Sequence, residues 1–200
     1  DLSEVEAADI VTVQRSKRKI SMDFLEDLAA LARHYGVLLA SHDDDTPEKI
    51  DLMASLGVTV AEFPLSGPTA KYARSRKMRT GMGAPNVVRG KSQSGNISAR
   101  MLLEQDCCDF LCSDYHPSSM LQAVYAVHRN LGMDLGKAFS LITATPATIV
   151  GLDDRGMIAP GKLADLTIIE DQPIAKVVMT IKAGKPVYSS SDCLCTHAYA

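Results

Sequence analysis

The chain has 200 residues, 46% of them hydrophobic, which is enough to fill the core of a globular protein. Its formal net charge of −3 at pH 7 argues against a general nucleic-acid binder and against a membrane-surface binder. Its longest uncharged stretch, 138–152, is too short to cross a bilayer, and its five cysteines follow no scaffold-like pattern, so we expect a cytoplasmic protein with reduced thiols.

Helical and strand-like segments alternate over the first part of the chain. Apolar spacing, a hydroxyl cap before proline and a terminal glycine predict helices at 22–36, 46–57, 66–78 and 99–105. Short apolar runs predict strands at 37–41, 58–63, 79–85 (with its loop) and 109–114. Strands that alternate with helices in this way form βα units, so we expect a parallel sheet in an α/β fold.

After residue 115 the pattern changes. Two helical stretches are expected at about 118–131 and 134–143, and residues 156–190 contain short β-rich runs interrupted by Gly and Pro. We therefore expect three parts: an α/β part at 1–150, a small β segment at 151–190 and a loose tail at 191–200.

Acidic and imidazole side chains follow the ends of the predicted strands. His42 precedes three consecutive aspartates at 43–45, Glu62 ends the second strand and Asp114 ends the fourth. Because the carboxyl ends of parallel strands meet at one edge of the sheet, these groups are expected to lie close together. Imidazole nitrogen and carboxylate oxygen suit Zn²⁺ or Mn²⁺, so His42 and Asp114 are the candidate metal ligands, with Glu62 as a third.

Structural roles are the alternative for several of these residues. His42 could cap the following helix, and His116 could reach the same edge or stay in its loop. One of the aspartates at 43–45 is expected to lie near His42, and the others in a solvated cluster favourable to the helix dipole. The cysteines at 107–108 lack the spacing of a zinc site and are expected to be buried or inert.

Residues 84–98 are expected to form a long loop that binds an anion. The segment contains Arg89, Lys91 and small residues, and a helix is expected to open at Gly95-Asn96. Backbone amides at a helix start, together with Arg and Lys, suit phosphate. No dinucleotide or Walker motif is present. The candidate substrate-binding residues at this edge are Asn86, Arg89, Lys91, Ser94, Asn96, Tyr115 and His116.

Several motifs resemble those of a known superfamily. TATPATIVGLDDRGMIAPGKLADLTIIE (143–170) resembles the closing segment of the amidohydrolase superfamily, where the last barrel helices give way to a small β domain. Four further stretches are similar to its PhnM family of phosphonate-metabolism hydrolases: ASHDDDT (40–46), AEFPLS (61–66), MGAPNVVRGKSQSGN (82–96) and SDYHPSSML (113–121). The resemblance covers most of residues 20–185. It implies a cytoplasmic, metal-dependent (β/α)8 TIM-type barrel that releases pyrophosphate from α-D-ribose 1-methylphosphonate 5-triphosphate.

The resemblance also implies roles for individual residues. His42 would be the metal-binding histidine of the fifth barrel strand, and Asp114 the acid after the eighth strand, which binds the metal and takes a proton from the attacking water. Glu62 stands where many members have a histidine, so its role as a ligand is open. The superfamily's first-strand His-x-His pair and fourth-strand bridging ligand have no counterpart here.

The four predicted strands therefore match strands five to eight, which is the C-terminal half of a barrel. We expect weak or absent metal binding by this chain alone, and either a homo-oligomer or pairing with a missing N-terminal half. Two other functions stay open: an amidohydrolase acting on C–N bonds, such as a cyclic amidase or deaminase, and an inactive half-barrel fragment. The basic, Ser/Gly-rich segment at 84–98 favours a phosphorylated substrate.

Overall fold

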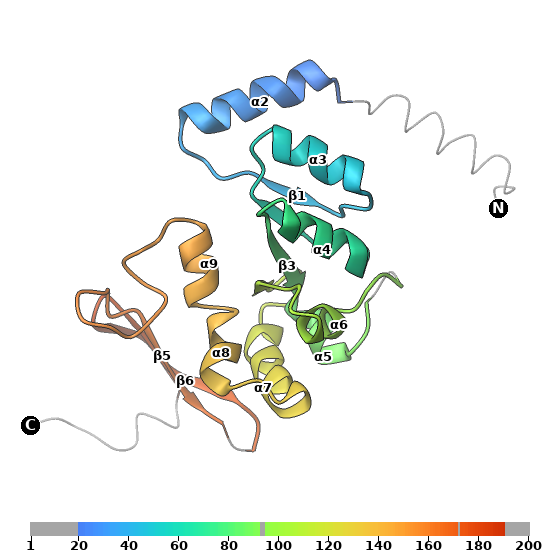
Figure 1. Cartoon of the computed structure of the whole chain (residues 1–200). Helices are drawn as coiled ribbons and strands as arrows, with labels where there is room; N and C mark the ends of the chain where they lie inside the picture. Colours follow the sequence, from blue (N-terminus) through green and yellow to red (C-terminus); the bar gives the residue numbers. More distant parts are fainter. Residues whose placement is uncertain (1–19, 93–94, 172, 191–200) are drawn as a thin grey trace, which may run out of the picture.

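The computed structural model describes residues 20–92, 95–171 and 173–190 (Figure 1). Four short strands form one parallel sheet in chain order, as the alternation of strands and helices predicted. They are β1 (Ala40–His42), β2 (Val60–Glu62), β3 (Arg79–Gly83) and β4 (Phe110–Cys112). The register pairs His42 with Glu62, Glu62 with Gly81, and Gly83 with Cys112, so the four strands end at a common edge.

Helices follow the strands and continue beyond the sheet. They are α2 (Met22–His34), α3 (Pro47–Ser55), α4 (Gly67–Ser75), α5 (Ala84–Arg89), α6 (Ala99–Glu104), α7 (Ser119–Leu131), α8 (Leu135–Ser140) and α9 (Ala144–Ile149). At Ser21, Thr46, Ser66 and Ser98 the cap hydroxyl accepts a hydrogen bond from the amide three residues on. The helix start at Thr46 was predicted from its hydroxyl, which is possible because capping is a local interaction.

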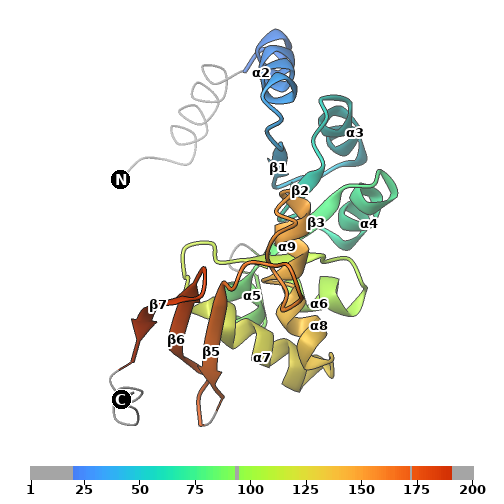
Figure 2. The same cartoon turned by 90° about the vertical axis from the view of Figure 1, so that its left-hand side faces the viewer.

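One face of the sheet is covered by helices. Ala61 of β2 lies in one buried apolar cluster with Ile50 of α3, and Leu111 of β4 lies in another with Val124 of α7. Because side chains alternate along a strand, the neighbouring Glu62 and Cys112 point to the opposite face. Figures 1 and 2 show α3 and α4 side by side along the covered face.

A second sheet lies well away from α2 (Figures 1 and 2). Its strands are antiparallel and in the order β5 (Leu166–Glu170), β6 (Lys176–Lys182) and β7 (Lys185–Ser189). Gln122 of α7 donates a hydrogen bond to the carbonyl of Ala175 at 2.8 Å, which joins this sheet to the helices. The predicted β-rich segment is thus confirmed, while the division near residue 150 stays a prediction and the tail at 191–200 lies outside the described residues.

Two sequence predictions about local structure were wrong. Residues 84–98 are not one loop, since α5 occupies 84–89, and the next helix opens at Ala99 rather than at Gly95-Asn96. Pro85 suits the first turn of a helix, and burial of Ala84 and Val87 stabilises α5. The short helix α9 was also not predicted. None of the helices in the described ranges is long and apolar enough to cross a membrane.

Candidate functional site

A pocket of about 440 Å³ lies at the carboxyl edge of the parallel sheet and is lined by both His42 and Asp114. The two predicted metal ligands, which are separated by 72 positions in the chain (114 minus 42), thus face one cavity. Strand β3, helix α5 and the loops after the strands supply the other lining residues, which are Asp43, Phe63, Pro64, Met82, Asn86, Ser92, Asn96, Ile97 and Tyr115.

Three residues at this edge have left-handed backbone conformations. The φ angles of Asp43, Phe63 and Asp114 are 54°, 55° and 50°, values that are uncommon for residues other than glycine. The amide of Asp43 donates to the carbonyl of Glu62 at 3.0 Å, and that of Phe63 to Gly81 at 2.9 Å, so the ladder continues past each strand. Such strained positions are found most often at binding and catalytic sites.

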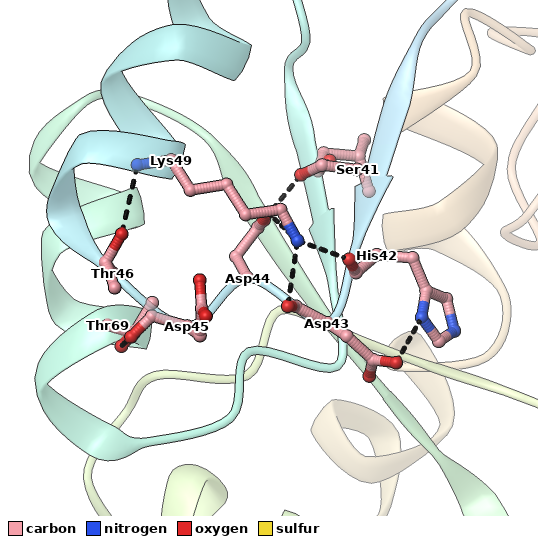
Figure 3. Close-up of polar contacts among 9 residues, drawn as sticks. Ser41, His42, Asp43, Asp44, Asp45, Thr46, Lys49 and Thr69 are labelled. Atoms are coloured by element: carbon pink, nitrogen blue, oxygen red, sulfur yellow. Dashed lines mark hydrogen bonds and ion pairs between the residues drawn. The ribbon is translucent and has the colours of Figure 1, made fainter. Parts of the chain in front are cut away.

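His42 lies between a carboxylate and an aromatic ring. Its Nδ1 is 3.1 Å from Oδ2 of Asp43 (Figure 3). Its ring centroid is 5.0 Å from that of Phe63. The side chains of His42 and Asp43 are each 59% exposed. A carboxylate on Nδ1 is the common arrangement for a metal-binding histidine, because it sets the ring orientation and leaves Nε2 as the ligand atom.

The three consecutive aspartates occupy different environments. Asp44 is fully buried: Ser41 donates its hydroxyl to Oδ2 at 2.5 Å, and Nζ of Lys49 lies 3.3 Å from Oδ1. The prediction of a solvated cluster was therefore wrong for Asp44 and is confirmed for the exposed Asp45. The turn places the carboxylate of Asp44 in the interior, where the ion pair with Lys49 and the hydrogen bond from Ser41 offset its desolvation.

Gly83 makes room for the aromatic ring and the acid. A Cβ at this position would lie 3.0 Å from the ring of Phe63 and 3.4 Å from Oδ2 of Asp114. Because the backbone of β3 approaches both groups so closely, a larger residue here would displace the ring against which His42 packs. Phe63 and Gly83 therefore shape the pocket, and neither carried a chemical signal in the sequence.

Glu62 is not among the residues that line the pocket. Its carboxylate lies against the thiol of Cys112, whose pKa is raised to about 12 by burial first and then by the charges of Glu62 and Asp114. Burial also raises the pKa of the Cys108 thiol. The thiols of Cys108 and Cys112 are thus protonated near neutral pH. Cys107 and Cys108 are both buried, as predicted for that pair.

The predicted anion-binding residues are only partly brought together. Asn86, Asn96 and Tyr115 line the pocket. Arg89 reaches its rim, because its Nη2 donates to Oδ1 of Asn86 at 3.1 Å and its guanidinium lies 5.8 Å from the centroid of the Tyr115 ring.

Three other candidates stand apart from this group. Lys91 is exposed and is not a lining residue, and the His116 ring hydrogen-bonds the hydroxyl of Ser118 at 3.1 Å instead. Ser94 lies outside the described residues. Ser92 also lines the pocket but was not predicted, because nothing in the sequence distinguishes it from the neighbouring serines.

The described ranges hold no group of three or more His, Cys, Asp or Glu side chains placed to bind a metal ion. His42 and Asp114 provide the nitrogen and oxygen donors that a divalent ion prefers. Catalytic zinc sites normally use three protein ligands, so the donor types fit while their number does not complete a site.

A larger cavity of about 1030 Å³ lies between helices α7 and α8 and strands β5 and β6. Its lining is mostly apolar, and its titratable members are Asp165 and Lys176. It contains no histidine, cysteine or paired acids, so the pocket at His42 is the better candidate for chemistry.

Comparisons with known proteins show which family the chain resembles. The family model described as "Amidohydrolase family" matches residues 22–188. The chain is 42% identical over 145 residues to alpha-D-ribose 1-methylphosphonate 5-triphosphate diphosphatase of Escherichia coli K12, covering 72% of this chain and 38% of that protein. It is 27% identical over 182 residues to adenine deaminase 1 of Carboxydothermus hydrogenoformans, covering 84% and 30%.

Solved structures show the same fold at larger size. An amidohydrolase from Thermotoga maritima superposes with a TM-score of 0.65 at 20% identity, covering 92% of this chain and 52% of that one. A beta-aspartyl dipeptidase from Fervidobacterium islandicum gives a TM-score of 0.66 at 15% identity, covering 86% and 54%. The chain thus spans about half of these structures and less than two fifths of its curated relatives.

Proposed function

The chain belongs to the amidohydrolase family, and from that premise we propose that it is part of a cytoplasmic, metal-dependent hydrolase that releases pyrophosphate from α-D-ribose 1-methylphosphonate 5-triphosphate. The observation that carries the proposal is the pocket that joins His42 and Asp114, with Arg89 at its rim. The name of the 42% identical relative supplies the substrate.

We further propose that the described α/β part is the C-terminal half of a (β/α)8 barrel, with β1 to β4 as its strands five to eight and the antiparallel sheet as part of a small β domain. Four parallel strands in chain order and structural neighbours of twice the length support this. The remaining metal ligands would then come from the other half of the barrel. On this view the chain pairs with such a half or with another copy of itself.

Four residues in or beside the pocket have a task in the proposed reaction. A divalent metal, Zn²⁺ or Mn²⁺, would be held by His42 and Asp114 and would supply the Lewis acidity that makes water nucleophilic near neutral pH. The Asp114 carboxylate accepts the proton of the attacking water and orients its oxygen. Arg89 and Asn96 offset the negative charge that spreads over the phosphoryl oxygens as pyrophosphate leaves.

Two specific observations favour the other functions. The similarity to adenine deaminases favours hydrolysis of a C–N bond. The incomplete donor set in the described ranges favours an inactive fragment. The cation at the rim favours a phosphorylated substrate over adenine, since a neutral base gains little from a guanidinium.

A chimera tests the proposal. The matched residues of this chain replace the matched region of the E. coli relative, and release of pyrophosphate from the triphosphate substrate and of ammonia from adenine are measured. We expect pyrophosphate release that falls at least ~100-fold in D114N and H42A, because each removes a metal ligand. D27N, an exposed acid of α2, serves as the control.

The possible results separate the three functions. Ammonia release without pyrophosphate release would replace the proposal with a C–N hydrolase. A folded chimera that binds metal and hydrolyses neither compound would support the inactive fragment.

A further inference from the structure

One lysine that does not line the pocket makes hydrogen bonds and an ion pair with the segment that carries His42. Lys49 lies in α3, and its Nζ is 2.9 Å from the carbonyl oxygen of His42, 2.9 Å from that of Asp43 and 3.3 Å from Oδ1 of Asp44 (Figure 3). Two of the N–H donors of the ammonium group thus go to the two carbonyls, and the contact with Asp44 is an ion pair. A single side chain thus contacts three consecutive residues.

The backbone conformation makes this contact possible. Asp43 has a φ of 54°, and consecutive carbonyls that would diverge in a strand here converge on one ammonium group. Asp44, the partner of Lys49 in the ion pair, is fully buried and accepts a hydrogen bond from Ser41 of β1. Asp44 therefore links Lys49 to β1 through Ser41. The side chain of Lys49 is only 34% exposed.

The contact between His42 and Asp43 cannot orient the imidazole by itself. Both side chains are 59% exposed, and an exposed pair of this kind contributes roughly 0–1 kcal/mol. The pair keeps its geometry only if the backbone of both residues is fixed. The sheet holds the amide of Asp43, which donates to the carbonyl of Glu62. The hydrogen bonds from Lys49 add the restraint on the carbonyls of His42 and Asp43.

We propose that Lys49 is a positioning residue: by bonding the carbonyls of His42 and Asp43 it fixes the direction in which the His42 imidazole enters the pocket. The inference rests on the proposed role of His42 as a metal ligand. Lys49 does not itself line the pocket, and it contacts no reacting atom.

The test uses the whole chain and the variants K49M, K49R and K71M. K49M keeps the length of the side chain and removes its charge and donors, K49R restores a cation with donors, and K71M alters an exposed lysine of α4. Nitrogen-15 spectra of the His42 ring report which ring nitrogen carries the proton in the neutral form, without any metal. Because the chain alone is expected to bind metal weakly, titration with Co²⁺, followed by its visible absorption, is made on the chimera described above carrying the same substitutions, with H42A as reference.

We expect the proton of wild-type His42 on Nδ1, which faces Asp43, and a mixture of both tautomers in K49M. Co²⁺ binding should weaken by ~10-fold or more in K49M, the usual effect of removing a partner of a metal ligand, and K49R should recover part of both changes. K71M should match the wild type. If K49M does not fold, K49Q takes its place.

Two results would count against different claims. A K49M variant with the wild-type ring spectrum and wild-type Co²⁺ affinity overturns the proposal for Lys49. If instead H42A binds Co²⁺ as well as the wild type, His42 is not a metal ligand and the proposed function fails at that residue. The ring spectrum then decides the positioning role alone.

Discussion

At the scale of single residues, the run at 43–45 shows how one residue type can serve three purposes. Asp43 contacts the ring of His42, Asp44 is buried in an ion pair with Lys49, and Asp45 is exposed with its carbonyl accepting a hydrogen bond from the hydroxyl of Thr69 at 3.1 Å. The left-handed conformation at Asp43 turns the chain, so that the three aspartate side chains point in different directions. The cation of Lys49 and the hydroxyl of Ser41 offset the hydration that the Asp44 carboxylate loses on burial.

Arg89 offers a test of anion binding at the same scale. Replacing it in R89M should weaken pyrophosphate binding about 10-fold or more, because hydrogen bonds to charged groups contribute roughly 1.5–3 kcal/mol. Isothermal titration calorimetry measures the affinity. The matched control is R129M, since Arg129 also stacks on a tyrosine, Tyr125, at 5.2 Å but belongs to α7 and lies outside the pocket lining. An equal loss in both variants would remove Arg89 from the site.

At the scale of elements, the parallel strands are joined at both ends. At the carboxyl end the ladder continues through Asp43 and Phe63. At the opposite end Asp109, which precedes β4, accepts from the amide of Thr80 at 2.8 Å and pairs with Arg74 of α4 at 2.8 Å. Burial alone would raise the pKa of Asp109, but these hydrogen bonds and charges outweigh it and lower the pKa.

D109N should therefore lose about 2 kcal/mol of stability at neutral pH, the scale of a charged hydrogen bond. Since the folded pKa lies below the ordinary value of 3.8, the carboxylate stabilises the fold above that pH, and the contribution disappears as the pH falls through the folded pKa. Urea unfolding at neutral and acidic pH measures the difference, which should shrink in acid. D106N, at an exposed position, is the control; a difference independent of pH would contradict the assignment.

At the scale of the whole molecule, the described part leaves large apolar side chains in water. On α2 and its flanks Phe24 is 56%, Leu31 54% and Tyr35 70% exposed. β1 and β4 form the two edges of the parallel sheet, and exposed edges favour pairing with another chain. Apolar surface of this kind marks an interface in natural proteins, which supports the proposed missing half or second copy.

L31E should consequently reduce self-association of the purified chain. A charge on α2 opposes burial of the apolar face against another molecule, so the average mass in solution should fall toward that of the monomer. Sedimentation velocity at several concentrations measures it, with K71E as a control charge change on α4. A wild-type chain that stays monomeric at all concentrations would show that α2 does not form such an interface.

Local interactions made part of this molecule predictable from its sequence. Hydroxyl caps at Thr46 and Ser66 and the alternation of strands and helices predicted the parallel sheet, and polar residues at strand ends predicted that His42 and Asp114 share one edge. Each of these signals depends on residues within a few positions or on a general rule for parallel sheets.

Other features depended on contacts between distant segments. The ring of Phe63 against Gly83 and the place of Glu62 beside Cys112 join residues that no local pattern connects. The contact of Lys49 with the carbonyls of His42 and Asp43 spans only six or seven positions, but it depends on the left-handed turn at Asp43, which no pattern in the sequence predicted. The short helix α5 forms because its residues are buried, and burial is a property of the packed molecule. The sequence thus determined which chemical groups reach the edge of the sheet, and only the tertiary structure decided which of them meet, because packing sets the direction of each side chain.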